Sequence, residues 1–131
     1  HVLGPRRCAA AIVAEMDGAP AGFALYYRTF STFAAKTGVF LEDLYVRPDF
    51  RKRGIGRALL AAVLRRGIAS GEFRAVDVEA TINVVIAPLL MLIVWRFSLS
   101  ACGPDEVDPD VLLKTHFDLL MHGLCAQKRK R

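Results

Sequence analysis

The sequence predicts a mixed α/β fold of the α+β type, in which antiparallel strands over residues 11–46 precede one amphipathic helix and an all-helical second half. Up to residue 46, the apolar runs are rich in Val, Phe, Tyr and Leu, as strand surfaces prefer. After residue 54 the apolar residues recur every three or four positions, as on one face of a helix. With 131 residues, 53% of them hydrophobic, the chain has enough material for one compact domain.

Three strands are expected in the first part of the chain. The first, AAIVAEM, leads into Asp17-Gly18, a pair typical of tight hairpin turns, and GFALYYRTF follows as the second strand. Residues 31–38 are expected to form a loop, and residues 39–46 (VFLEDLYV) a third strand. Pro48 should lie beyond its end, because proline cannot donate to a strand ladder.

Three helices are expected in the rest of the chain. The first has an apolar stripe made of Ile55, Leu59, Leu60, Val63, Leu64 and Ile68. Asp77 is expected to cap a second helix, in which Pro88 should cause a kink or a restart. Asp108-Pro109 is a typical capped start for the third helix, and Gly123 is its expected end.

The charge of the sequence indicates which kinds of molecule it could bind, and its cysteine content indicates the cellular compartment. The net charge is +5, and a short stretch concentrates Arg47, Arg51, Lys52, Arg53 and Arg57. Such a stretch suits a small anionic ligand, an acidic partner or nucleic acid. Three cysteines without CxxC spacing argue against a disulfide framework and for a reducing, cytoplasmic location.

Membrane and metal sites are not expected. Residues 84–95 are apolar throughout but are fewer than the ~20 needed to span a bilayer, so a buried or interface helix is the better interpretation. His116 and His122 are six residues apart and do not share a helix face, so we expect no metal site.

The most informative segment is LEDLYVRPDFRKRGIGRALL (41–60), in which a strand, a glycine-rich turn and a helix follow one another directly. Arg51-x-x-Gly54-x-Gly56 falls where the helix should begin. The first amides of a helix lack intrahelical partners and carry the positive end of its dipole. Glycines allow a phosphate to approach that backbone closely, and arginines add charge. The turn therefore predicts an anion cradle, and the alternative is a solvated, basic connection.

The surroundings of this turn resemble motif A of the GCN5-related N-acetyltransferases (GNAT), in which [QR]-x-x-G-x-[GA] follows a strand ending like YVRP. The resemblance extends backward through DGAPAGFALYY (17–27), STF (31–33) and LEDLYV (41–46). This series is similar to the diamine and thialysine acetyltransferase branch. The resemblance covers residues 8–66 and implies that residues 1–66 form a partial acetyl-CoA-binding region.

The resemblance also implies the site residues, with acetyl-CoA as cofactor and a polyamine or an amino-acid side-chain amine as substrate. The pantetheine arm would lie along one strand, an amide near Leu44 would polarise the thioester carbonyl, and the turn's amides would hold the pyrophosphate. The implied cofactor-binding residues are Leu44, Tyr45, Val46, Arg51, Lys52, Arg53, Gly54, Ile55, Gly56 and Arg57. Glu42 matches the glutamate that removes the amine's proton, through water, because an amine of pKa ~10.4 is charged at neutral pH. Otherwise Glu42 is a solvent-facing strand-edge carboxylate.

The sequence departs from the family pattern in two respects. A strand and two helices that precede this series in the family have no counterpart in the sequence, and nothing after residue 67 matches the motif that should follow. That motif carries the tyrosine that serves as general acid. The three tyrosines here, Tyr26, Tyr27 and Tyr45, all lie upstream, so no general acid is assigned. Acetyl transfer would be impaired if these segments are required.

Residues 64–125 resemble the C-terminal half of a TetR-type regulator, on RRGIASGEFR (65–74), APLLMLIVWRFS (87–98) and DPDVLLKTHFDLLMHGL (108–124). This implies a helical region over residues 67–131 whose helices 78–98 and 109–124 form a homodimer. The family's DNA-reading helix-turn-helix has no counterpart, so direct DNA binding is not expected.

The main prediction is an acetyl-CoA-dependent N-acetyltransferase acting on a small amine. The alternatives are a non-catalytic dimerisation or ligand-binding module and a fragment without stable activity.

Overall fold

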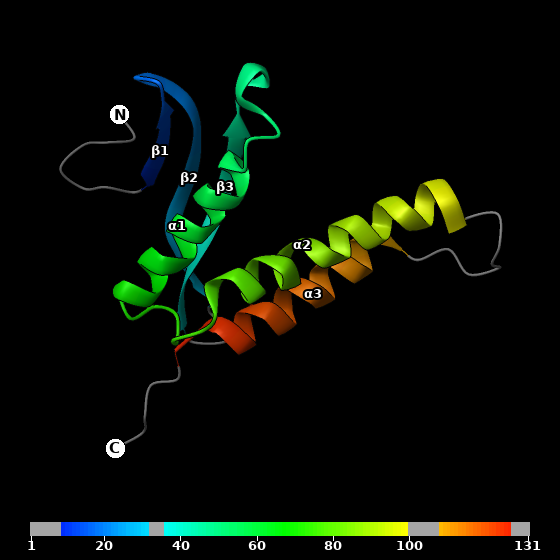
Figure 1. Ribbon diagram of the computed structural model, residues 1–131. Helices are drawn as coiled ribbons and strands as arrows, with labels where there is room; N and C mark the ends of the chain where they lie inside the picture. Colours follow the sequence, from blue (N-terminus) through cyan, green and yellow to red (C-terminus); the bar gives the residue numbers. More distant parts are fainter. Residues whose placement is uncertain (1–8, 32–35, 100–107, 127–131) are drawn as a thin grey trace.

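The computed structural model describes residues 9–31, 36–99 and 108–126. In these residues a three-stranded antiparallel sheet of order β1-β2-β3 is followed by the helix α1, and the helices α2 and α3 form a pair that extends away from the sheet (Figure 1). The predicted α+β class, with strands first and helices after them, is confirmed.

A tight hairpin turn connects the first two strands, and a long antiparallel ladder pairs the second with the third. β1 (Ala10–Met16) and β2 (Ala19–Ser31) are joined by Asp17 and Gly18, whose φ angles of 54° and 74° are the pair of positive values that a type I′ turn needs. The predicted hairpin is therefore confirmed. β3 (Lys36–Val46) begins earlier than the predicted residue 39, because its ladder with β2 continues to the end of that strand.

One face of the sheet packs against α1 (Ile55–Ala69). The buried residues of this core are Ala21, Ala24, Tyr26, Ile55, Leu59 and Val63. The end of β3 approaches β2 closely at Gly22, where an added Cβ would lie 2.5 Å from the carbonyl oxygen of Tyr45. Only glycine therefore fits at this position without a shift of the backbone.

The two later helices begin at the predicted caps. The Asp77 carboxylate accepts a hydrogen bond from the Ala80 amide (2.7 Å) at the start of α2 (Val78–Val94), and a π-helix (Trp95–Leu99) continues it. Asp108 caps α3 (Pro109–Leu124) in the same way, which ends one residue after the predicted Gly123.

The predicted restart at Pro88 is wrong, because α2 continues through this residue as one helix. Proline removes a single N–H donor from a helix, and the turns on both sides keep their own hydrogen bonds. α2 also packs against α1 and α3, and these tertiary contacts add to the stability of the helix.

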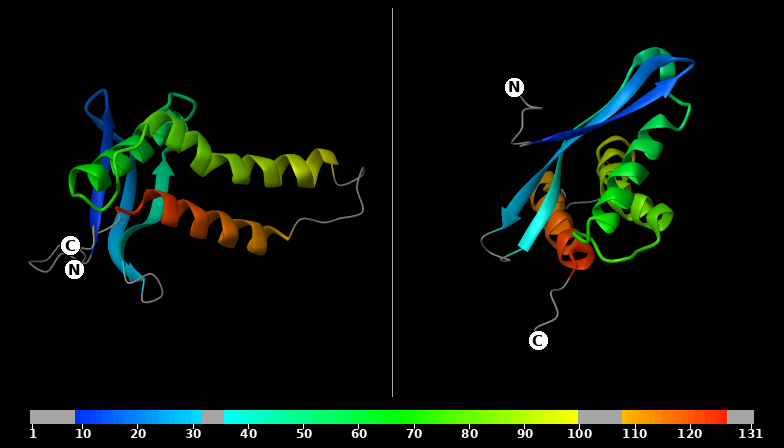
Figure 2. Two further views of the ribbon diagram at one scale, coloured as in Figure 1. Left: turned by 90° about the horizontal axis from the view of Figure 1, so that it is seen from below. Right: turned by 90° about the vertical axis from the view of Figure 1, so that its left-hand side faces the viewer.

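A second core joins the helical pair to α1. Its buried residues are Ala61, Leu64, Phe73, Ile82 and Leu124. The chain after α1 also pairs with the chain after α3, through a bridge between Phe73 and Cys125. The predicted regions 1–66 and 67–131 thus pack together at the base of the helical pair, while the far ends of α2 and α3 project beyond the sheet (Figure 2).

Candidate functional site

The start of α1 has the geometry that the sequence predicts for an anion cradle. Gly54 precedes the helix with a left-handed φ of 78°, and α1 begins at Ile55 without a side-chain cap. A Cβ added to Gly54 would meet no atom within 4 Å, and one on Gly56 would meet only Val46 Cγ2, at 3.8 Å. The helix does not extend upstream through Arg51. The first amides of α1 therefore lie at an open surface.

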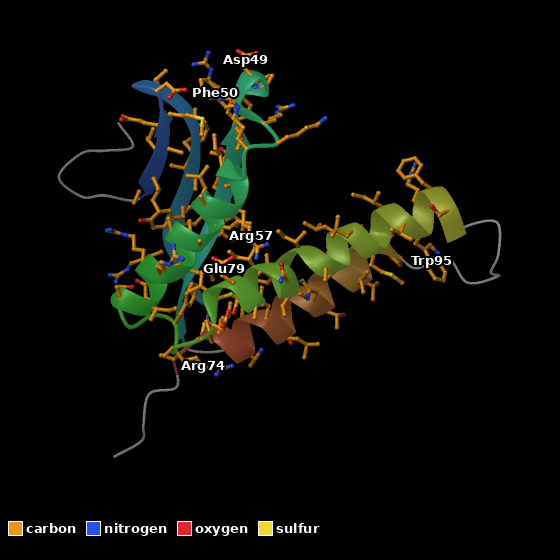
Figure 3. The ribbon with its side chains drawn as sticks, in the orientation of Figure 1. Asp49, Phe50, Arg57, Arg74, Glu79 and Trp95 are labelled. Carbon is orange, nitrogen blue, oxygen red and sulfur yellow. The ribbon has the colours of Figure 1, made fainter. Side chains whose placement is uncertain are left out.

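Basic side chains surround this turn and are fixed by contacts with the sheet. Arg51 Nε donates to the Val46 carbonyl (3.0 Å), which ties the turn to the end of β3. Arg47 and Arg53 stack on Phe50, with their guanidinium carbons 5.2 Å and 5.7 Å from the ring centroid. Phe50 belongs to a short 3-10 helix (Pro48–Phe50) at the end of the sheet (Figure 3). The positive charges are thus held near the open amides.

The side chain of Arg57 does not face the glycine turn, where the sequence prediction placed it among the cofactor-binding residues. Its guanidinium turns toward α2, where it donates to Glu79 Oε2 (2.9 Å) and Asn83 Oδ1 (3.0 Å) (Figure 3). Arg57 therefore offers the turn its backbone amide, while its side-chain charge is compensated by Glu79. Sequence reasoning missed this pair, although Glu79 and Asn83 are spaced to share one face of a helix.

The predicted pantetheine-binding residues lie on an open sheet edge. β3 pairs with β2 on one side, and in the described residues no strand pairs with its other side. Leu44 and Tyr45 are exposed, and the Tyr45 ring lies beside Phe23 with the ring centroids 5.8 Å apart. The free peptide groups of an edge strand can bond an extended ligand. This edge runs directly into the turn through Val46.

Glu42 lies at an irregularity of the same strand. Leu25 pairs with Asp43 and Tyr26 pairs with Leu41, so Glu42 is an extra residue in the ladder. Such bulges disrupt pairing and redirect side chains. Glu42 and Asp43 are both exposed. Glu42, the open edge of β3 and the glycine turn therefore follow one another along the chain, with the exposed carboxylates before the edge residues and the basic turn after them.

Two cavities lie away from these residues. One, of about 430 Å³, lies between the sheet and the C-terminal part of α1, where Glu72 forms an ion pair with Arg28. The other, of about 690 Å³, lies between α2 and α3 beside His116. None of the predicted site residues lines either cavity. In the described ranges, no group of three or more His, Cys, Asp or Glu side chains could hold a metal ion.

A basic, glycine-rich turn at the uncapped start of a helix is an arrangement that suits phosphate groups, because the backbone amides point outward and carry the positive end of the helix dipole. Residues 3–87 match the Acetyltransferase (GNAT) family. The chain belongs to this family. The match also runs beyond residue 66, where the sequence resemblance was expected to end, and takes in most of the described α2.

Several curated relatives are similar to part of the chain. L-ornithine N5-acetyltransferase NATA1 of Arabidopsis thaliana is 31% identical over 71 residues, covering 53% of this chain and 31% of the relative. Thialysine N-epsilon-acetyltransferase of Caenorhabditis elegans is 38% identical over 69 residues, covering 50% and 42%. Tyramine N-feruloyltransferase 4/11 of Nicotiana tabacum is 42% identical over 56 residues, covering 40% and 25%. The matched region is thus less than half of each relative.

A solved structure of a ribosomal-protein-alanine N-acetyltransferase from Brucella melitensis is 29% identical, with a TM-score of 0.44 over 50% of this chain and 48% of that chain. The second resemblance, of residues 64–125 to TetR-type regulators, finds no support in these comparisons. The helices themselves were predicted from apolar periodicity and caps, which unrelated helical pairs share.

Proposed function

We propose that the chain binds acetyl-CoA along β3 and the glycine turn, and that it serves acetyl transfer to a small amine. One observation carries this proposal: the first amides of α1, behind the left-handed Gly54, lie uncapped at an open surface among arginines. A helix start of this kind favours a diphosphate through its N–H groups and its dipole. The GNAT membership agrees with this choice of ligand.

The substrate class follows from charge and from the relatives. The names of the relatives contain ornithine, thialysine and tyramine, all of which are amines. In this chain, Glu42 and Asp43 place two exposed carboxylates beside the part of β3 that would hold the acetyl end of the cofactor. Adjacent carboxylates raise the local concentration of a cation. We therefore propose a polyamine or an amino-acid side-chain amine as acceptor.

Each part of the proposed site has one chemical task. When bound, acetyl-CoA supplies an acetyl group on a thioester. The amides of residues 55–57 donate to the diphosphate, and the open edge of β3 binds the extended arm. The amide near Leu44 donates to the carbonyl oxygen, on which negative charge develops. Glu42 accepts the amine's proton through water, because the amine must be neutral to attack.

Isothermal titration of the full chain with CoA and acetyl-CoA tests the proposal, with two matched variants. Gly54→Ala and Gly71→Ala flank the same helix, both glycines have left-handed φ (78° and 74°), and both have open space at the Cβ position. Each variant should lose roughly 1–2 kcal/mol of unfolding free energy from backbone strain. Only Gly54→Ala should weaken CoA binding, because its methyl group occupies the space before the amides.

Pantetheine, which lacks the diphosphate, is the matched ligand. It should bind much more weakly than CoA if the turn provides most of the affinity. Equal binding of CoA by both glycine variants, or no binding of CoA by the folded wild-type chain, would contradict the proposed site. Binding without acetylation of any amine would leave the cofactor site standing and remove the enzymatic part of the proposal.

A further inference from the structure

The arginines around the glycine turn differ in whether a carboxylate compensates their charge. Arg57 is compensated, because its Nη2 lies 2.9 Å from Glu79 Oε2. Arg51 and Arg53 are exposed, and no carboxylate in the described part of the chain forms an ion pair with either of them. The uncompensated positive charge of the turn therefore lies on the residues that precede Gly54.

The guanidinium of Arg53 is held in place by groups that leave its charge intact. Arg53 Nη1 donates to the Met16 sulfur (3.4 Å), and the guanidinium carbon lies 5.7 Å from the centroid of the Phe50 ring. Arg47 stacks on the same ring, although its Nη2 also lies 3.9 Å from Asp49 Oδ2. Stacking covers the face of a guanidinium and leaves the N–H groups at its edge able to donate. Phe50, which packs against the core between the sheet and α1, therefore holds two cations beside the turn.

The contact with Met16 shows on which side of the turn Arg53 lies. Met16 is the last residue of β1, and the strand order β1-β2-β3 places β1 on the side opposite to the open edge of β3. The proposed pantetheine arm follows that open edge into the turn. A linear ligand whose diphosphate binds the first amides of α1 would therefore continue past the turn, toward Arg53 and the Phe50 ring at this end of the sheet (Figure 3).

We propose that Arg51 and Arg53, with Phe50 as a positioning residue, bind the 3′-phosphate of CoA, so that the chain distinguishes CoA from dephospho-CoA, which lacks this group. The inference rests on the proposed function, because it takes the diphosphate to bind at the start of α1. Beyond the diphosphate, CoA carries an adenosine with a phosphate monoester on its 3′ oxygen. Such a monoester has a charge of about −1.5 to −2 at pH 7 and three acceptor oxygens. It can therefore bond two guanidinium groups at once.

Isothermal titration of the full chain with CoA and with dephospho-CoA tests the inference. At low salt, CoA should bind at least about tenfold more tightly than dephospho-CoA, because only CoA carries the monoester. The preference should decline as salt increases, since exposed charges are screened. Arg53→Gln should lower the preference at least about threefold. Arg66→Gln is the matched control: it makes the same charge change at an exposed residue in the last turn of α1, and it should keep the preference.

Two variants of Phe50 test its positioning role. Phe50→Leu keeps an apolar side chain against the core and removes the aromatic face, so the preference for CoA should fall about two- to fivefold. Phe50→Tyr keeps the ring and should restore the preference. If Phe50 only stabilised the turn, Phe50→Leu would weaken both ligands in proportion and leave their ratio unchanged. That result would contradict the positioning role.

The outcomes separate this inference from the proposed function. Equal affinity of the wild type for CoA and dephospho-CoA would overturn the 3′-phosphate site and leave the diphosphate site standing. Binding of neither ligand by the folded wild type would remove the diphosphate site, and this inference with it. A preference that Arg53→Gln and Arg66→Gln lower equally would reflect only the net charge of the chain, and would also overturn the proposed site.

Discussion

Glu79 in the first turn of α2 holds the guanidinium of Arg57 in the first turn of α1, with both Arg57 Nε and Nη2 lying 2.9 Å from Glu79 Oε2. Arg57 Nη1 donates in addition to Asn83 (3.0 Å). Both side chains are partly exposed, so the pair itself adds little to the free energy of unfolding. Its position matters more, because it compensates a positive charge directly beside the candidate diphosphate site.

Removing this compensation should strengthen the binding of CoA. In Glu79→Gln, the Arg57 charge remains and its partner is neutral, so we expect about two- to fivefold tighter binding at low salt. The gain should fade as salt increases, because exposed charges are screened within ~8–10 Å near physiological ionic strength. Asp110→Asn, which makes the same charge change on α3, is the control and should leave the affinity unchanged. Unaltered binding by Glu79→Gln at every salt concentration would show that Arg57 does not act on the bound anion.

Glu42 and Asp43 should affect different kinetic parameters. Glu42→Gln removes the proposed proton acceptor, so kcat should fall by about 10²–10⁴-fold while CoA binds as before. Asp43→Asn removes the neighbouring negative charge but keeps Glu42, the proposed base. KM for the amine should therefore rise with little change in kcat. Steady-state kinetics over a series of amine concentrations separates the two effects. If both variants change KM alone, Glu42 attracts the amine and does not accept its proton.

Two helical glycines should respond in opposite directions to the same substitution. A Cβ added to Gly67 in α1 would lie 2.5 Å from Cε2 of the buried Phe73 ring, whereas one on Gly123 in α3 would meet no atom within 4 Å. Gly67→Ala should therefore lower the free energy of unfolding by about 1–3 kcal/mol through overpacking. Gly123→Ala should raise it by about 0.5–1 kcal/mol, because alanine favours the helix.

Urea unfolding followed by circular dichroism measures both changes. Phe73→Leu in the background of Gly67→Ala provides the control, because a smaller side chain should relieve part of the clash. Additive losses in this double variant would mean that the methyl group added by Gly67→Ala and the ring of Phe73 do not compete for the same space.

Features that depend on neighbouring residues in the chain could be predicted from the sequence. Asp17-Gly18 requires the conformation of a tight hairpin turn, and Asp77 and Asp108 bond the amides that follow them. The exposed glycine turn before α1 belongs to the same group. Each of these features is determined within a few residues, so a local pattern is sufficient to locate it.

Features that depend on distant partners could not be predicted in this way. Glu42 is an extra residue in the ladder only because of how β2 pairs with β3, and Arg57 faces α2 only because Glu79 lies there. Pro88 is expected to interrupt an isolated helix, but α2, which packs against α1 and α3, continues through it. The comparisons do not support the regulator-like resemblance of residues 64–125, and a helical fold by itself does not identify a family.

The cap of α2 should contribute measurably to the stability of the whole domain. Asp77 Oδ1 accepts from the Ala80 amide at 2.7 Å, and the turn that it caps carries Glu79 and leads directly into the fully buried Ile82. Asp77→Ala should therefore lower the free energy of unfolding by about 0.5–2 kcal/mol, whereas Asp77→Asn, which keeps a side-chain acceptor, should lower it much less.

Asp108→Ala removes a similar cap from α3, whose start is exposed and far from the shared core. Its loss should fray the first turn of α3 with a smaller effect on global unfolding. Hydrogen exchange of the amides in α1 distinguishes the two cases, because only loosening of α2 at Ile82 should reach that helix. Faster exchange in α1 for Asp108→Ala but not for Asp77→Ala would contradict this assignment of the shared core.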